Sequence, residues 1–308
     1  MKKFLPEGYK FSTEENKTVL SSLENLKKAC ATGETVEGRA ILCDREHNLH
    51  VDLGVIKGII PRVEGAIGID DGSVRDIALI SRVNKTVAFK ILKFETDENM
   101  NTYAVLSRKA AQLECQEKYI SKLLPGDVID ARVTHMENFG VFADIGAGIS
   151  ALLPIDSISV SRIPHPRARF NINQDIKAVV KSVDESGRVT LTHKELLGTW
   201  SENARMFSVG ETVPGIVRSV ENFGIFVELA PNLAGLAEVV GNVEADYFAS
   251  VYIKSIIPDK MKIKLIIVDA FEQTNTNASP LQYFSDANHI DVWKYSPDSC
   301  DKIIETRF

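Results

Sequence analysis

The chain has 308 residues, of which 44% are hydrophobic and 25% charged, an ordinary globular mixture with enough material for two or three domains. The formal net charge of −6, from 36 basic and 42 acidic residues, argues against a strong nonspecific binder of duplex nucleic acid. The four cysteines form no CxxC pair, which argues against a disulfide framework or a zinc site. The N-terminus lacks the apolar run of a signal peptide, and no stretch approaches the roughly 18 apolar residues of a membrane span. We therefore expect a soluble, cytoplasmic protein that does not bind membranes.

The first predicted element is a helix near the N-terminus. Ser12–Glu15 resembles a capping box, and it precedes Val19, Leu20, Leu23 and Leu26 at helical spacing, which predicts a helix over about 13–30. Two further segments rich in Ala, Glu, Lys and Leu, Arg108–Leu123 and His193–Met206, are predicted linker helices. Helical linkers would make an array of domains semi-rigid.

Internal repeats dominate the remainder of the chain. Gly126-Asp127 recurs at Gly210-Glu211, and at the same offset of 84 residues Glu137–Phe142 (ENFGVF) becomes Glu221–Phe226 (ENFGIF), with no gap between the two anchors. A third, divergent copy begins at Gly33–Val36 and aligns only after one inserted residue. The chain thus contains three copies of one unit.

Each copy has the pattern of five short strands. In the middle copy the predicted strands lie near 127–136, 139–145, 150–154, 175–184 and 187–193, with a hairpin turn at Asp184–Gly187. Five short strands in about 70 residues suit a small Greek-key barrel of the OB type. The predicted fold is mainly β, with three tandem five-stranded OB-fold barrels joined by helical linkers. The expected divisions are an N-terminal helical segment (1–32), a divergent first barrel (33–108), a linker helix (109–123), a second barrel (124–193), a second linker helix (194–207), a third barrel (208–270) and a C-terminal tail that caps the third barrel (271–308).

At the ENFGVF and ENFGIF segments the sequence resembles the RNA-binding domain of small-subunit ribosomal protein S-one, and the likeness covers about residues 33–270. The resemblance implies that RNA lies across two aromatic residues of strand two, a His of strand three, and an Asp and an Arg that bracket the fourth turn. The middle copy then supplies Phe139, Phe142, Asp184 and Arg188, with Pro154 in the His place. The third copy supplies Phe223 and Phe226, with Lys262 in the Arg place, Glu238 in the His place and Pro258 in the Asp place. In the first copy His47 and His50 occupy the two aromatic positions and Pro61 the strand-three position.

The residue types fit single-stranded RNA. Aromatic rings stack on exposed bases with little regard to base identity. Two rings three residues apart would normally point to opposite faces of a strand, and we expect Gly140 and Gly224 to form bulges that turn both rings toward one surface. The alternative is that one Phe of each pair belongs to the barrel core. We expect basic side chains beside the rings to bind the RNA phosphates. The candidates are Arg132, Arg162, Arg167, Arg169 and Arg188 in the middle copy, and Arg218, Lys254, Lys262 and Lys264 in the third.

Charge is unevenly distributed along the chain. Residues 1–108 carry 16 basic and 16 acidic residues and 109–206 carry 12 of each, so the acidic excess lies wholly in the last hundred residues, with 8 basic and 14 acidic. A near-neutral domain can still hold single strands by stacking.

Catalytic signatures (HExxH, the P-loop, GxSxG, the Rossmann glycines) do not occur, and we expect neither an enzyme, nor a cofactor, nor a metal site. The leading hypothesis is a protein that holds mRNA near the small ribosomal subunit, which it could contact through the first domain. The alternatives are a regulatory or stress RNA-binding factor that acts off the ribosome, and a protein-interaction scaffold whose OB barrels have lost RNA. The acidic C-terminal region and the missing strand-three His residues favour the scaffold.

Overall fold

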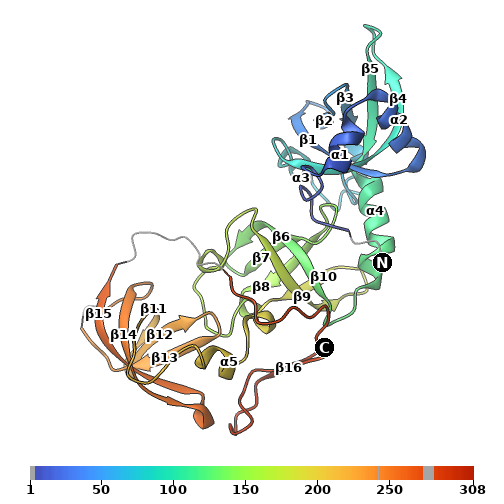
Figure 1. Cartoon of the computed structure of the whole chain (residues 1–308). Helices are drawn as coiled ribbons and strands as arrows, with labels where there is room; N and C mark the ends of the chain where they lie inside the picture. The colour runs from blue at the N-terminus through green and yellow to red at the C-terminus, as the bar shows by residue number, and fades with distance from the viewer. Residues whose placement is uncertain (1–3, 242, 273–280) are drawn as a thin grey trace. The chain divides into compact units, whose positions relative to one another are not determined.

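The computed structural model describes residues 4–241, 243–272 and 281–308. It contains three closed five-stranded antiparallel-rich barrels in chain order (Figure 1), which confirms the predicted fold class. In each barrel the first strand pairs with the second, and the fifth strand pairs with the third and closes the barrel. This is the strand order expected of an OB fold. The chain divides into two compact units, residues 1–123 with 144–150, and residues 124–143 with 151–308.

The first unit contains the first barrel. Thr13 and Ser22 each cap a helix by accepting a backbone N–H, from Asn16 and Asn25, so the single helix predicted over 13–30 is wrong: it is two helices, broken where Ser22 takes an extended conformation. Leu26 and Ala29 pack the second helix on the barrel core, and Val19 and Leu20 pack the first against it. The elements are α1 (Glu14–Leu20), α2 (Leu23–Thr32), β1 (Thr35–Cys43), β2 (Leu49–Asp52), β3 (Lys57–Ile60), η1 (Arg62–Glu64), α3 (Ile77–Ile80), β4 (Thr86–Thr96), β5 (Thr102–Ser107), α4 (Arg108–Lys118) and η2 (Ile120–Lys122).

A buried ionic cluster fastens the N-terminal segment within this unit. The Glu7 carboxylate binds the Arg108 guanidinium at 2.7 Å and Arg82 at 3.3 Å, and the Glu7 backbone N–H donates to Asp144 at 2.7 Å. Burial raises the pKa of Asp144 to about 6, whereas the two arginines hold the pKa of Glu7 below its ordinary value. Every carboxylate here has a cation or an N–H donor, whereas the buried Nε of Arg82 has no hydrogen-bond partner among the described residues.

The second unit contains the other two barrels and the tail. The second linker is interrupted because Gly198 has a φ of +81° and Thr199 starts a new helix with a capping box to Glu202. The elements of the second barrel are β6 (Val128–Glu137), β7 (Gly140–Asp144), β8 (Ser150–Pro154), η3 (Ile155–Ser157), η4 (Pro166–Ala168), β9 (Asp175–Val183) and β10 (Val189–Thr192), followed by η5 (Lys194–Leu197) and α5 (Trp200–Ala204). Those of the third are β11 (Thr212–Glu221), β12 (Gly224–Ala230), β13 (Leu233–Ala237), β14 (Phe248–Ile257), η6 (Pro258–Lys260) and β15 (Lys262–Phe271), with β16 (Val292–Lys294) and β17 (Glu305–Arg307) in the tail.

The tail was expected on the third barrel, and its described part, 281–308, contacts both barrels of the unit. Ile290 and Asn288 exchange backbone hydrogen bonds with Gly126 and Val128 of the second barrel. Trp293 and Tyr295 join the core of the third barrel, where the Tyr295 hydroxyl donates to the Asn232 carbonyl oxygen at 2.6 Å. The aromatic residues of the tail are therefore largely packing residues, and residues 273–280 of the predicted tail lie outside the described residues.

Candidate nucleic-acid interface

An exposed pair of phenylalanines lies at the start of β7 in the second barrel. Val141 and Ala143 point into the barrel and are fully buried, so Phe142 between them points to the outer face, where it is half-buried. Phe139 lies in the turn that precedes the strand and is 56% exposed. The two ring centroids are 6.0 Å apart and the ring planes are at 89°, an edge-to-face contact that leaves the face of one ring open.

The third barrel repeats this geometry. Ile225 and Val227 of β12 are buried inside the barrel, Phe226 is half-buried on the outer face, and Phe223 in the preceding turn is 70% exposed. The ring centroids of Phe223 and Phe226 are 6.1 Å apart at 85°. Neither Phe of either pair is a core residue.

The glycine between the two phenylalanines of each pair was expected to form a bulge, and the structure gives it a different role. In the third barrel the β11–β12 register is regular at Gly224 and shifts between Val217 and Ser219 instead, so the predicted bulge is wrong there. The first Phe of each pair lies in the turn before the strand, so the alternation of side chains between the two faces of a strand does not apply to it. A Cβ on Gly140 would lie 2.5 Å from the Leu153 carbonyl oxygen, and one on Gly224 would lie 2.8 Å from that of Ala237. The glycines therefore permit close approach of the next strand.

His135 is a ring that the sequence reasoning missed. It lies on β6, where its imidazole stacks on Phe142 with centroids 6.3 Å apart and planes at 26°, and its Nε2 is 2.7 Å from a Glu137 carboxylate oxygen. The side chain is 61% exposed. The available signal was its strand position: it lies 84 residues before Ser219, which pairs directly with Phe226 in the third barrel.

The fourth turn of the second barrel joins Asp184 and Arg188. One Asp184 carboxylate oxygen accepts hydrogen bonds from the backbone N–H groups of Ser186 and Arg188, each at 2.9 Å, and from the Ser186 hydroxyl at 2.7 Å. These bonds, the Ser186 hydroxyl foremost, hold the pKa of Asp184 below its ordinary value. Asp184 therefore shapes the turn, and Arg188 is exposed beside it.

Cross-strand pairing in the third barrel places cations beside the rings. Phe226 pairs with Leu236 on β13, which pairs in turn with Lys264 on β15. Lys264 is therefore two strands from Phe226, roughly 10 Å away. Lys262 lies two residues earlier on the same strand, and both lysines are exposed. In the second barrel the equivalent pair is Leu152 and Thr190, two residues after Arg188.

The remaining predicted arginines fall into two groups. Arg162 and Arg167 are exposed in the long connection between β8 and β9, and Arg132 binds Asp175 at 2.6 Å. Arg169 is buried and the Arg218 side chain is 7% exposed, and both bind the buried Glu228, at 2.5 and 2.8 Å. Burial also lowers the pKa of Arg169. Because Glu228 occupies their guanidinium groups away from solvent, we leave both out of the interface.

The first barrel differs at the same face. His50 occupies the strand-two position, and its Nε2 is 3.0 Å from an Asp44 carboxylate oxygen. His47 has a φ of +62°, a turn conformation, and is 3.9 Å from Asp76. Two imidazoles engaged by carboxylates replace the two phenyl rings, so this face does not offer the stacking surface of the other barrels.

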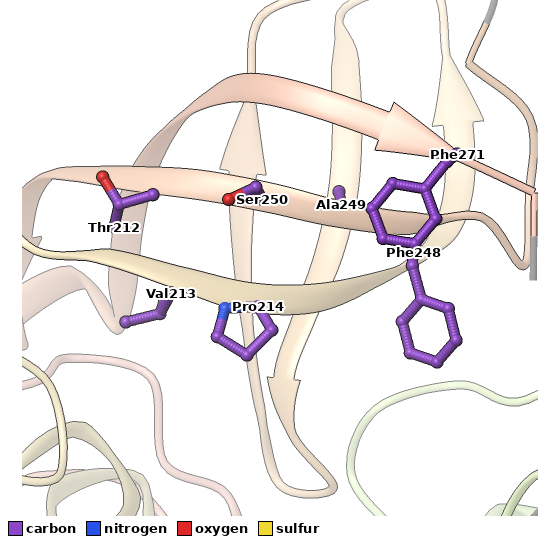
Figure 2. A pocket seen from close by; sticks show the side chains of 7 residues that line it. All are labelled: Thr212, Val213, Pro214, Phe248, Ala249, Ser250 and Phe271. Atoms are coloured by element: carbon purple, nitrogen blue, oxygen red, sulfur yellow. The ribbon is translucent and has the colours of Figure 1, made fainter.

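A shallow pocket of about 210 Å³ lies elsewhere on the third barrel (Figure 2). It is lined by Thr212, Val213 and Pro214 of β11, Phe248, Ala249 and Ser250 of β14, and Phe271 of β15. The Phe223–Phe226 pair does not line it. Among the described residues, no group of three or more His, Cys, Asp or Glu side chains could hold a metal ion, and no helix is long and apolar enough to cross a membrane.

The barrels and their outward aromatic pairs define a multidomain OB-fold protein with the surface of a nucleic-acid-binding module. A family model described as the S1 RNA binding domain matches residues 122–194. Small ribosomal subunit protein bS1 of Staphylococcus epidermidis (strain ATCC 35984) is 31% identical over 281 residues, which cover 84% of this chain and 69% of that protein. The chain belongs to the bS1 family of small ribosomal subunit proteins.

Other relatives match over shorter lengths. bS1 of Staphylococcus aureus (strain COL) is 32% identical over 197 residues, 62% of this chain and 48% of that protein, so the chain spans about half of that relative. A solved structure from Streptococcus pneumoniae, described as a multidomain protein with nucleic acid binding domains, is 15% identical and covers 79% of this chain and 76% of that chain, with a TM-score of 0.25. At that score the likeness supports no argument about this chain.

Proposed function

We propose that this protein binds single-stranded RNA, without catalysis and without a cofactor, through the outer faces of its second and third barrels. The observation that carries the proposal is the duplicated, exposed, edge-to-face Phe pair. An exposed aromatic pair costs solubility, and its repetition at the same place in two barrels is accounted for by base stacking. The proposed contacts are Phe139, Phe142, His135, Asp184 and Arg188 in the second barrel, with Arg132, Arg162 and Arg167 toward the phosphates, and Phe223, Phe226, Lys262 and Lys264 in the third.

Asp184 acts mainly by holding the turn that presents Arg188. The second barrel should bind more strongly than the third, because it has three rings where the third has two. The third also has the exposed Glu238 at the position of Pro154, and this carboxylate repels phosphates. Two binding faces in one chain raise the effective RNA concentration for the second once the first is engaged.

We further propose that the protein acts in translation, in the cytoplasm, by holding mRNA near the small ribosomal subunit. The support is membership of a family of small ribosomal subunit proteins. The first barrel lacks the rings at the RNA-facing positions, so it is the candidate for contact with the ribosome. Co-sedimentation of the full chain with purified small subunits tests this role, and absence from the subunit fraction would favour a regulatory factor that acts off the ribosome.

Titration of the full chain with a fluorescently labelled oligo(U) of about a dozen nucleotides tests RNA binding itself. We expect binding that the combined Phe139→Ala and Phe223→Ala substitutions largely remove. The second candidate function is a protein scaffold, which the acidic C-terminal region favours. Oligo(U) affinity that is immeasurable, or unaffected by the double substitution, would support the scaffold.

A further inference from the structure

One strand of the third barrel is paired along only part of one edge. On one side β15 pairs with β14 from Lys262 to Phe271. On the other side it pairs with β13 only at Lys264 and Leu265, because β13 ends at Ala237. Within the part of the chain that the structure describes, no backbone group pairs with this second edge from Ile266 to Phe271. The edge therefore lacks a strand partner over six residues, and the Ala270 N–H donates to the Asp269 carboxylate at 2.9 Å.

The side chains along this edge are apolar and exposed. The sequence from Ile266 to Phe271 is IIVDAF, and Ile266, Val268 and Phe271 are 45%, 62% and 56% exposed. The β14–β15 register shift leaves Val268 without an opposite residue. Proteins commonly protect such edges with lysine or proline, and neither occurs between Leu265 and Glu272. Six residues at about 3.4 Å give an edge roughly 20 Å long, enough for one short extended segment.

The charges around the edge select the kind of partner. Asp269 lies on β15, and Glu272 directly follows the strand. Glu238 follows Ala237, which pairs with Leu265 of β15. The three carboxylates are exposed. No lysine or arginine lies between Leu265 and Glu272. Asp269 and Glu272, which lie beyond the lysines of β15, repel a phosphate backbone and attract basic side chains. A second copy of this chain would bring the same carboxylates, so charge favours a different, basic partner.

We propose that the β15 edge from Ile266 to Phe271 docks an extended segment of a partner protein by strand addition, a segment that carries apolar side chains and at least one lysine or arginine. Main-chain hydrogen bonds supply affinity in this mode and side chains supply selectivity. The apolar side chains of the segment would pack on Ile266, Val268 and Phe271, and a basic one would pair with Asp269. Phe271 also lines the apolar pocket shared with Phe248 (Figure 2), which extends the surface beyond the edge. This function is separate from RNA binding.

Two labelled ten-residue probe peptides test the proposal on the full chain: one alternates valine with lysine and the other alternates valine with glutamate. Hydrogen exchange should show slower exchange of the amides of 266–271 with the lysine peptide and no change with the glutamate peptide. Val268→Lys should weaken lysine-peptide binding by about tenfold or more, since a charged edge opposes strand addition. Tyr252→Lys is the matched control, because Tyr252 is 37% exposed but lies on β14, which is paired on both sides at that residue.

Retained oligo(U) affinity in Val268→Lys would show that the variant is folded and that the edge is independent of RNA binding. Equal binding of both peptides, or no protection of 266–271 by the lysine peptide, would refute the proposal. Equal losses in Val268→Lys and Tyr252→Lys would refute the assignment to the edge. A wild-type dimer that Val268→Lys converts to monomer would assign the edge to a second copy and overturn the basic partner.

Discussion

Replacing Phe139 or Phe223 with alanine separates stacking from packing, because the structure gives each role a different magnitude. Phe139 is 56% exposed, so the protein covers slightly less than half of its surface, about 90 Å² of the roughly 200 Å² of a phenylalanine. At about 25 cal/mol/Å², truncation should cost at most about 2 kcal/mol of unfolding free energy. For Phe223, 70% exposed, the cost should be about 1.5 kcal/mol or less. A core phenylalanine would cost about 3–5 kcal/mol.

RNA affinity should respond more strongly than stability. Each lost stack should weaken binding by about 1–3 kcal/mol, or roughly 5- to 150-fold. Phe271→Ala is the matched control, since Phe271 has the same 56% exposure in the same unit but lies away from the proposed RNA face. Oligo(U) anisotropy titrations and thermal melts of the three variants give both quantities. Equal oligo(U) affinity in wild type, Phe139→Ala and Phe223→Ala, with all folded, would refute stacking.

Three further predictions concern other parts of the molecule. His135→Ala should weaken oligo(U) binding by about 1 kcal/mol, toward the low end of a base stack, whereas His135→Phe should restore it; failure of the phenylalanine rescue would show that the ring is not a stacking surface. Binding should depend weakly on salt, with a log–log slope of about −1.5 to −3 for two to four phosphate contacts, and a slope steeper than about −5 would reveal a basic clamp. Burial raises the pKa of Glu37 to about 7, whereas its ordinary pKa in the unfolded chain is 4.5. Between these pH values the folded state binds a proton that the unfolded chain has released, so the free energy of unfolding falls as the pH rises. Glu37→Gln should remove this fall, up to about 3 kcal/mol in urea unfolding of the first barrel, and an unchanged pH profile would contradict the buried carboxyl.

The fold was predictable from the sequence because its signals are local and repeated. The Phe-Gly-x-Phe segments, the Asp184–Gly187 turn and the alternating strands fix where each barrel strand begins, and the observed strands of the second barrel lie within two residues of the predicted ones. Helix breaks were less predictable. The break at Ser22 depends on one serine that caps a new helix rather than continuing the old one, and both choices fit the apolar spacing.

The candidate site was predictable only in part, because exposure and pairing depend on tertiary contacts. The family resemblance singled out Arg188, but Arg169 and Arg218 were candidates only as cations within a repeat. Only folding brings Arg169 and Arg218 onto Glu228, a residue 59 positions from Arg169. The stack of His135 on Phe142 likewise needs the pairing of β6 and β7. The Arg169–Glu228 contact is long-range, and the spacing of residues along the chain does not indicate it. The His135–Phe142 stack lies within one hairpin, and only the 84-residue repeat offset pointed to it.

The carboxylates at the far end of β15 do not oppose the proposed RNA binding, because the strand places them far from its lysines. Lys262 and Lys264 lie at the start of the strand, beside the ladder that leads to Phe226, whereas Asp269 lies five residues beyond Lys264. At about 3.4 Å per residue this is roughly 17 Å, about two Debye lengths at physiological ionic strength. The carboxylates at the far end are therefore largely screened from RNA on the aromatic face. It follows that Asp269→Asn should leave oligo(U) affinity within about twofold of wild type at physiological salt, while it weakens binding of the lysine peptide. An oligo(U) affinity that rises severalfold in this variant would show that the two surfaces are electrostatically coupled.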